Sequence, residues 1–138
     1  MRIALMLSSL LWSGLTLEAR QLADVRISNA HLQIACLDAK PVEAGRRKWD
    51  LPERAVSMTF TMRNRPRAGR PGADAGFASI DFTPQPGHVY EIEVRSDPMR
   101  YSERVWPKGE WRAVVRDRTT DQIISGEPQW SDSPPCGR

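Results

Sequence analysis

Hydrophobic and polar residues alternate one by one along several stretches of this chain. In the stretch 56–63, apolar side chains occupy the even positions and hydroxyl or arginine side chains the odd positions. A period of two is typical of a β-strand with one buried and one wet face, and no helix-length segment after residue 19 has an apolar stripe with a period of 3.6. We predict six or seven strands, near residues 24–28, 31–37, 55–63, 77–83, 88–96, 110–117 and 122–126.

Turn-forming residues separate these strands. Pro84–Gly87 and Pro107–Gly109 interrupt the alternation, and Asp117–Asp121 is typical of a hairpin tip. The segments 38–54 and 64–76 are rich in charged residues, Pro and Gly and are expected to be surface loops. We therefore expect an all-β fold, an antiparallel β-sandwich of the Ig-like or PEGA-like kind, with a small barrel as the alternative.

The first nineteen residues have a different pattern. Arg2 is followed by an almost wholly apolar run over 3–15, and Thr16–Ala19 is a plausible cleavage region. This layout is typical of a cleavable secretory signal helix, and the run is short for a membrane span. We predict a signal peptide over 1–19 and one β-sandwich domain over 20–138. The mature protein is expected to be periplasmic or secreted, with no membrane span.

The chain has two cysteines, Cys36 and Cys136. In an oxidising compartment, an even pair in a small domain indicates a disulfide. We expect this bond to join an early strand to a C-terminal tail that has no strand character from Ser131 onward. A redox pair would more often have the C-x-x-C spacing, which is absent.

The mature charge is +3, because the leader contains one base (Arg2) and one acid (Glu18) and leaves 19 Lys and Arg against 16 Asp and Glu. This mild excess does not predict nucleic-acid binding. Four arginines without an intervening acid nevertheless cluster near one loop: Arg63, Arg65, Arg67 and Arg70. They are candidates to bind an anionic envelope polymer or the acidic rim of a partner protein. A second basic cluster, 46–48, lies beyond a strand of about nine residues and hence about 30 Å away. The alternative is that both loops are simply solvated.

Tryptophans supply a second set of candidates. Trp49 and Trp106 are expected in loops among charges, where they could stack on a ligand, whereas Trp111 shares a strand register with core positions. Glu91 and Glu93 lie on one strand face and are expected to pair with Arg95 and Arg112.

Catalytic and metal-binding patterns are missing from the sequence. His31 and His88 lack a second histidine at metal-ligand spacing, and there is no nucleophile elbow or Gly-rich phosphate loop. We expect no catalytic residues, no metal and no cofactor.

Three segments carry a family resemblance. They are 77–82, the Pro-Gly-His-x-Tyr run at 86–90 with the strand that follows it, and 111–124 with its Asp-x-x-Thr-x-x-x-Ile hairpin. Together they resemble small exported bacterial β-sandwich proteins of unknown function. Because the matching residues are turn and core positions, the resemblance implies the fold and no catalytic set. Many such proteins are lipid-anchored, but the anchoring motif is absent here.

The sequence thus predicts a non-catalytic binding or accessory module of the bacterial cell envelope. An inhibitor of a lysozyme-type cell-wall hydrolase is the alternative, with Ser125–Glu127 as its contact loop, although the rest of the known inhibitor pattern is missing. A small secreted hydrolase is the remote alternative.

Overall fold

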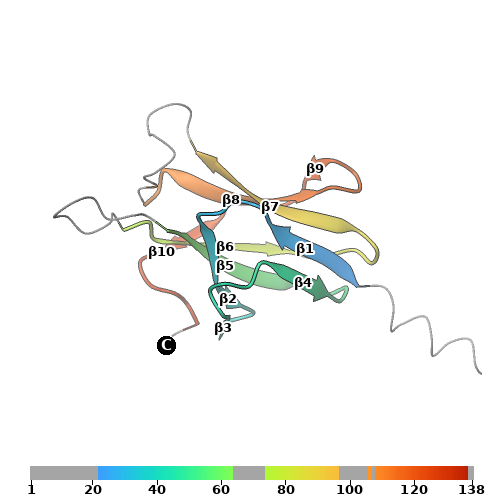
Figure 1. Ribbon diagram of the computed structural model, residues 1–138, viewed down its shortest axis with the longest axis horizontal. Coiled ribbons are helices and arrows are strands. Elements are labelled where there is room, and N and C mark those ends of the chain that lie inside the picture. Colours follow the sequence, from blue (N-terminus) through green and yellow to red (C-terminus); the bar gives the residue numbers. More distant parts are fainter. Residues whose placement is uncertain (1–21, 64–73, 97–105, 107, 137–138) are drawn as a thin grey trace, which may run out of the picture.

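The computed structural model describes residues 22–63, 74–96, 106 and 108–136, which form two five-stranded sheets and their connections (Figure 1). Sheet A has the order β4-β1-β7-β8-β9, and sheet B has the order β10-β6-β5-β2-β3. All strand pairs are antiparallel except β1 with β7. The strands of sheet A are β1 (Ala23–Ile27), β4 (Lys48–Leu51), β7 (Val89–Ser96), β8 (Trp111–Asp117) and β9 (Gln122–Ile123). Those of sheet B are β2 (Leu32–Leu37), β3 (Lys40–Pro41), β5 (Val56–Met62), β6 (Phe77–Phe82) and β10 (Gln129–Ser131).

The two sheets enclose one apolar core. Along β5, the residues at positions 56, 58, 60 and 62 are all buried, as the alternation in the sequence predicts. They pack in the same cluster as Tyr90, Ile92 and Val115 from sheet A. Because each sheet removes its apolar face from water only against the other, this packing is the main stabilising contribution. The all-β prediction is confirmed, and the arrangement is that of a β-sandwich.

All seven predicted strands are present, but the prediction missed β3, β4 and β10. The segment 38–54 is therefore not simply a loop, since β3 and β4 lie within it. β4 adds an edge to sheet A by pairing with β1, and the chain reaches sheet B again at β10, which pairs with β6. These strands have only two to four residues, too few for alternation to stand out in the sequence. The tail likewise keeps strand character up to Ser131.

A β-bulge in β2 determines where the disulfide lies. The register with β5 shifts between Ile34 and Cys36, so Cys36 stands opposite Thr59 instead of continuing the inward row that contains Ile34. Uninterrupted alternation along the strand predicted at 31–37 would have placed Cys36 on the same face as Ile34, and the bulge moves it to the other face. Cys36 and Thr59 lie on the outer face of sheet B, and both are nevertheless buried.

The C-terminal tail reaches these two residues through the predicted disulfide. Cys36 and Cys136 are bonded, with their Cα atoms 5.8 Å apart and 100 positions apart in the chain. Cys136 Sγ also lies 3.5 Å from the carbonyl oxygen of Ala35, the extra residue of the bulge. The disulfide prediction is confirmed, and the bond fastens the tail to the outside of sheet B.

Candidate ligand-binding groove

The four arginines singled out in the sequence are described only in part. Arg63 follows β5, is exposed, and donates its backbone N–H to the His31 carbonyl at 2.8 Å. Arg65, Arg67 and Arg70 lie outside the described residues. An anion-binding role for this cluster therefore stays a prediction.

The second basic cluster has a structural role in part. The Arg47 guanidinium donates to the carbonyl oxygen of Asn29, which ties the start of β4 to the turn after β1. The Arg46 guanidinium lies 5.6 Å from the centre of the Trp49 ring, within reach of a cation–π contact.

Trp49 is not the exposed platform that its charged neighbours suggested. It lies in β4, and only 1% of its surface is exposed, because β4 pairs with β1 and turns the indole into the core. Trp106 is half-buried and packs against the same core. Trp111 is in the core, as predicted, and its Nε1–H donates to the Ala75 carbonyl at 2.9 Å. Trp130, which the sequence analysis did not single out, is half-buried and stacks edge-on against Trp111 with ring centres 4.9 Å apart.

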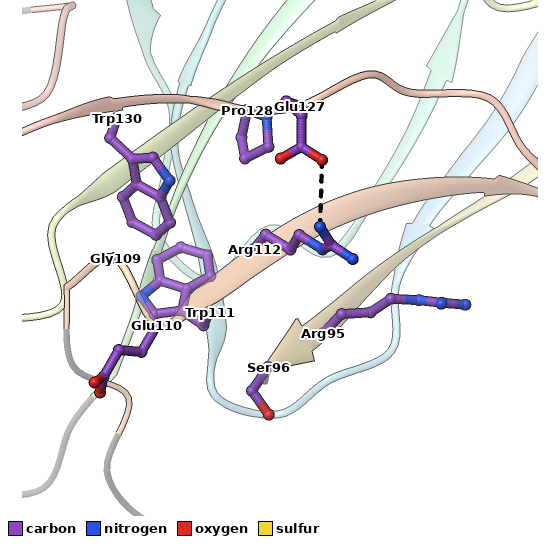
Figure 2. Close-up of a pocket in the computed structure, with 9 residues that line it drawn as sticks. All are labelled: Arg95, Ser96, Gly109, Glu110, Trp111, Arg112, Glu127, Pro128 and Trp130. Atoms are coloured by element: carbon purple, nitrogen blue, oxygen red, sulfur yellow. Dashed lines mark hydrogen bonds and ion pairs between the residues drawn. The ribbon is translucent and has the colours of Figure 1, made fainter. Parts of the chain in front are cut away.

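Two adjoining hollows lie along β8 of sheet A. The smaller, of about 150 Å³, is lined by residues that include Ser96, Trp111, Pro128 and Trp130 (Figure 2). The larger, of about 300 Å³, is lined by residues that include Val114, Ile123, Ser125 and Gly126. Arg95, Arg112 and Glu127 line both, so the two hollows form one groove, called here the sheet A groove.

Two arginines face each other in the middle of this groove. Arg95 in β7 stands directly opposite Arg112 in β8, and both side chains are substantially exposed. Like charges at directly opposed positions of an antiparallel pair are destabilising by a few tenths to about 1 kcal/mol. An anion between them would remove that repulsion.

The other basic residues of this sheet face are better neutralised. Arg116 Nε lies 2.6 Å from Glu93 Oε1, and Arg118 Nε lies 3.1 Å from Glu91 Oε2. The hydrogen bond from Arg116 to Glu93 raises the pKa of Arg116 above its ordinary value. The glutamates thus form surface ion pairs, as expected, although mainly with these two arginines.

Arg95 and Arg112 have weaker acidic partners. Arg95 Nη2 is 3.8 Å from Glu93 Oε2, and that carboxylate already accepts from Arg116. Arg112 does not pair with Glu91 or Glu93. Its Nη1 lies 3.3 Å from Glu127 Oε1, and the Glu127 side chain is 83% exposed on the segment before β10. Figure 2 shows this contact along one side of the groove.

His88 and Asp117 form a separate cluster at the hairpin. His88 Nδ1 lies 2.7 Å from Asp117 Oδ2, and Asp117 Oδ1 accepts the Thr119 backbone N–H at 2.9 Å. Burial alone would raise the pKa of Asp117, but the contacts with His88 and the backbone of Thr119 and Thr120 hold it below its ordinary value. Burial raises the pKa of Tyr90, whose hydroxyl accepts the Gln85 N–H at 2.7 Å. The Asp–Thr side chains predicted at this hairpin tip therefore organise the turn.

Comparison with known proteins identifies no relative. No protein-family model, curated protein or solved structure matches the chain. The resemblance to exported bacterial β-sandwich proteins therefore stays a prediction. Over the described ranges, no group of three or more His, Cys, Asp or Glu side chains could hold a metal ion, and no helix is long and apolar enough to cross a membrane.

Proposed function

We propose that this chain is an exported, non-catalytic binding module of the bacterial cell envelope, a β-sandwich of the Ig-like or PEGA-like kind that binds its ligand in the sheet A groove. The opposed pair Arg95 and Arg112 carries the proposal. The two arginines are directly opposed on neighbouring strands, and their acidic partners are a glutamate shared with Arg116 and the exposed Glu127, whereas an anionic ligand could accept hydrogen bonds from both.

The surroundings of the one buried carboxylate support a binding role over a hydrolytic one. Among the described residues, the buried polar side chains are Thr59 and Asp117. A general acid or base needs a carboxylate that faces its substrate, with a pKa near the working pH. The oxygens of Asp117 instead accept from His88 and Thr119, and its pKa is lowered.

The disulfide and the predicted leader support an exported site of action. The bond between Cys36 and Cys136 fits an oxidising compartment, because such bonds are rare in the cytosol. The apolar run at 3–15 would deliver the chain there. The envelope is therefore where we place the ligand.

Retention of envelope material on the immobilised protein tests this proposal. Arg95→Gln/Arg112→Gln should lose most of the retained material and flatten the dependence of retention on salt. A matched control, Arg26→Gln/Arg118→Gln, removes two exposed charges from the same sheet outside the groove and should bind like the unmodified protein. Equal retention by both double variants would contradict the proposal. Retention lost only in Arg63→Gln/Arg65→Gln/Arg67→Gln/Arg70→Gln would move the site to the arginine cluster.

One observation favours a second candidate, an inhibitor of a lysozyme-type hydrolase. Gly126 and Glu127 are exposed on the connection between β9 and β10, so that the Glu127 carboxylate can reach a partner. A protruding acid on such a segment could occupy the cleft of a cell-wall hydrolase. Inhibition of lysozyme by the purified protein, lost in Glu127→Ala, would support this role, and full lysozyme activity in excess protein would exclude it.

A further inference from the structure

We infer that the sheet A groove takes a small organic acid with a single carboxylate joined to an apolar group. This inference rests on the proposed function and specifies the ligand's chemical class. It follows from three properties of the groove: its central guanidinium pair, its apolar floor and its low net charge.

The guanidinium pair provides the contact for the acid group. The planar fork of an arginine matches the two oxygens of a carboxylate, and charge-assisted bonds of this kind are the stronger ones in proteins. Arg95 and Arg112 come from adjacent strands of a rigid sheet, so one carboxylate between them could accept from both. Among the described residues, their acidic partners are the shared Glu93 and the exposed Glu127.

An apolar floor adjoins this contact. Val114 projects on the outer face of sheet A, opposite Glu93, yet only 6% of its surface is exposed. Ile123, which lies opposite Arg116 on the same face, is 40% exposed at the edge of the larger hollow. An apolar group placed against Ile123 would leave water together with that exposed side chain, which favours binding in proportion to the buried area.

The charge balance selects a monoanion over a polyanion. Two arginines and one glutamate line the larger hollow, a formal charge of +1, while two arginines and two glutamates line the smaller, a formal charge of zero. A phosphorylated or polyanionic ligand would meet repulsion from Glu127. A single carboxylate can instead replace Glu127 at Arg112, because among the described residues the contact of the Glu127 side chain is this exposed one, at 3.3 Å.

Titration of the disulfide-bonded protein with hexanoate, followed by ¹H–¹⁵N NMR, tests the inference. Hexanoate should shift the backbone amide of Val114 and the indole N–H of Trp130 in a saturable way and leave the indole of buried Trp49 unchanged. Hexanamide, the neutral analogue, and inorganic phosphate should bind far more weakly. N-acetyl-leucine serves as a second monocarboxylate: tighter binding than hexanoate assigns the acid to a peptide terminus, and weaker binding assigns it to a free organic acid.

Two variants should change the affinity for hexanoate in opposite directions in the same titration. Arg95→Gln/Arg112→Gln should weaken hexanoate binding on the order of 10-fold or more, as expected for loss of charge-assisted bonds. Glu127→Gln should strengthen it about threefold or more, because the competing carboxylate is gone. Arg26→Gln/Arg118→Gln should leave it unchanged.

Two results would overturn the inference: hexanamide binding as well as hexanoate, or phosphate binding more tightly. Because these probes are compared on the unmodified protein, the test stands even if a variant fails to fold. If hexanoate does not bind but retention of envelope material still depends on Arg95 and Arg112, the ligand class is wrong and the proposed function survives. If that retention is also independent of both arginines, the proposed function fails too.

Discussion

Removal of the disulfide should destabilise this domain severely. Cys36→Ala/Cys136→Ala releases a constraint that closes a loop with a sequence separation of 100 residues. In the chain-entropy model, a loop of that length contributes about 4.7 kcal/mol by restricting the unfolded chain. Small domains have only about 5–15 kcal/mol of total stability, so the loss is roughly a third or more of the whole.

The folded state loses contacts as well. The disulfide holds Cys136 of the tail against Cys36 and the Ala35 carbonyl on the outside of sheet B, and nothing covalent holds it there once the bond is gone. The short pairing of β10 with β6 remains, because it involves Gln129–Ser131 and backbone hydrogen bonds that the substitution does not touch. The variant should therefore keep its fold, with a lower free energy of unfolding and a loosened tail.

Urea unfolding followed by tryptophan fluorescence measures this loss. The midpoint should fall by an amount equivalent to about 3–5 kcal/mol, and the unmodified protein should approach the variant when a reductant is added. The reductant should not change the variant itself, which controls for other effects of the reagent. A loss below about 1 kcal/mol would refute the reasoning, because the bond would then restrict the unfolded chain far less than the chain-entropy model requires.

Three further predictions concern the core, the hairpin and the bulge. Trp49→Ala should cost about 3–5 kcal/mol in urea unfolding, and Trp49→Phe clearly less, because phenylalanine keeps most of the buried ring and removes an indole N–H without a partner in the described structure. Asp117→Asn should cost about 1–3 kcal/mol at neutral pH. Because the folded pKa of Asp117 is lowered, its contribution is complete above the unfolded pKa of about 3.9 and disappears as the pH falls through the folded value. Unfolding should be measured from pH 6 to pH 2, a range of about four units that spans these pKa values. The free energy of unfolding should fall more steeply with falling pH for the unmodified protein than for Asp117→Asn. Parallel curves would contradict this role of Asp117. Deletion of Ala35 removes the extra residue and leaves Cys36 directly after Ile34, still opposite Thr59 on the outer face, so titration of the denatured variant should reveal no free thiols, and free thiols would contradict the register argument.

The longer strands could be predicted because their chemistry is local. β5, β7 and β8 each have seven or eight residues, enough for the alternation of buried and exposed side chains to exceed the background. The hairpin tip could be predicted in the same way, since Asp117 accepts the backbone N–H of Thr119 two residues further on. The cysteine pairing was predictable because only two cysteines are present.

The remaining features depend on partners distant in the chain. β4 contains only two apolar residues, Trp49 and Leu51, and it is a strand because β1 offers it an edge. The bulge at Ala35 cannot be predicted from the sequence, because small, polar and apolar residues already alternate in this run. Trp49 therefore seemed to be a loop residue among charges and turned out to be core.

The sheet A groove could not be predicted because it depends on register. The sequence placed Arg95 and Arg112 on outward strand faces, but only the pairing of β7 with β8 makes them direct neighbours. Arg112 instead meets Glu127 from the connection to β10, a strand that the alternation did not reveal. The sequence does show an arginine on the outer face of each of two consecutive predicted strands. It does not determine the register between these strands, so it does not show that the two arginines are neighbours.

The proposed envelope ligand and the proposed role both require export to an oxidising compartment, which the disulfide fits. The most direct test is the intact mass of the protein recovered from fractionated bacterial cells, determined with and without thiol alkylation. The account predicts a chain in the periplasmic or secreted fraction, cut near Ala19, two hydrogen atoms lighter than the dithiol and inert to alkylation. An uncut chain in the cytosolic fraction, with Cys36 and Cys136 both alkylated, would contradict it.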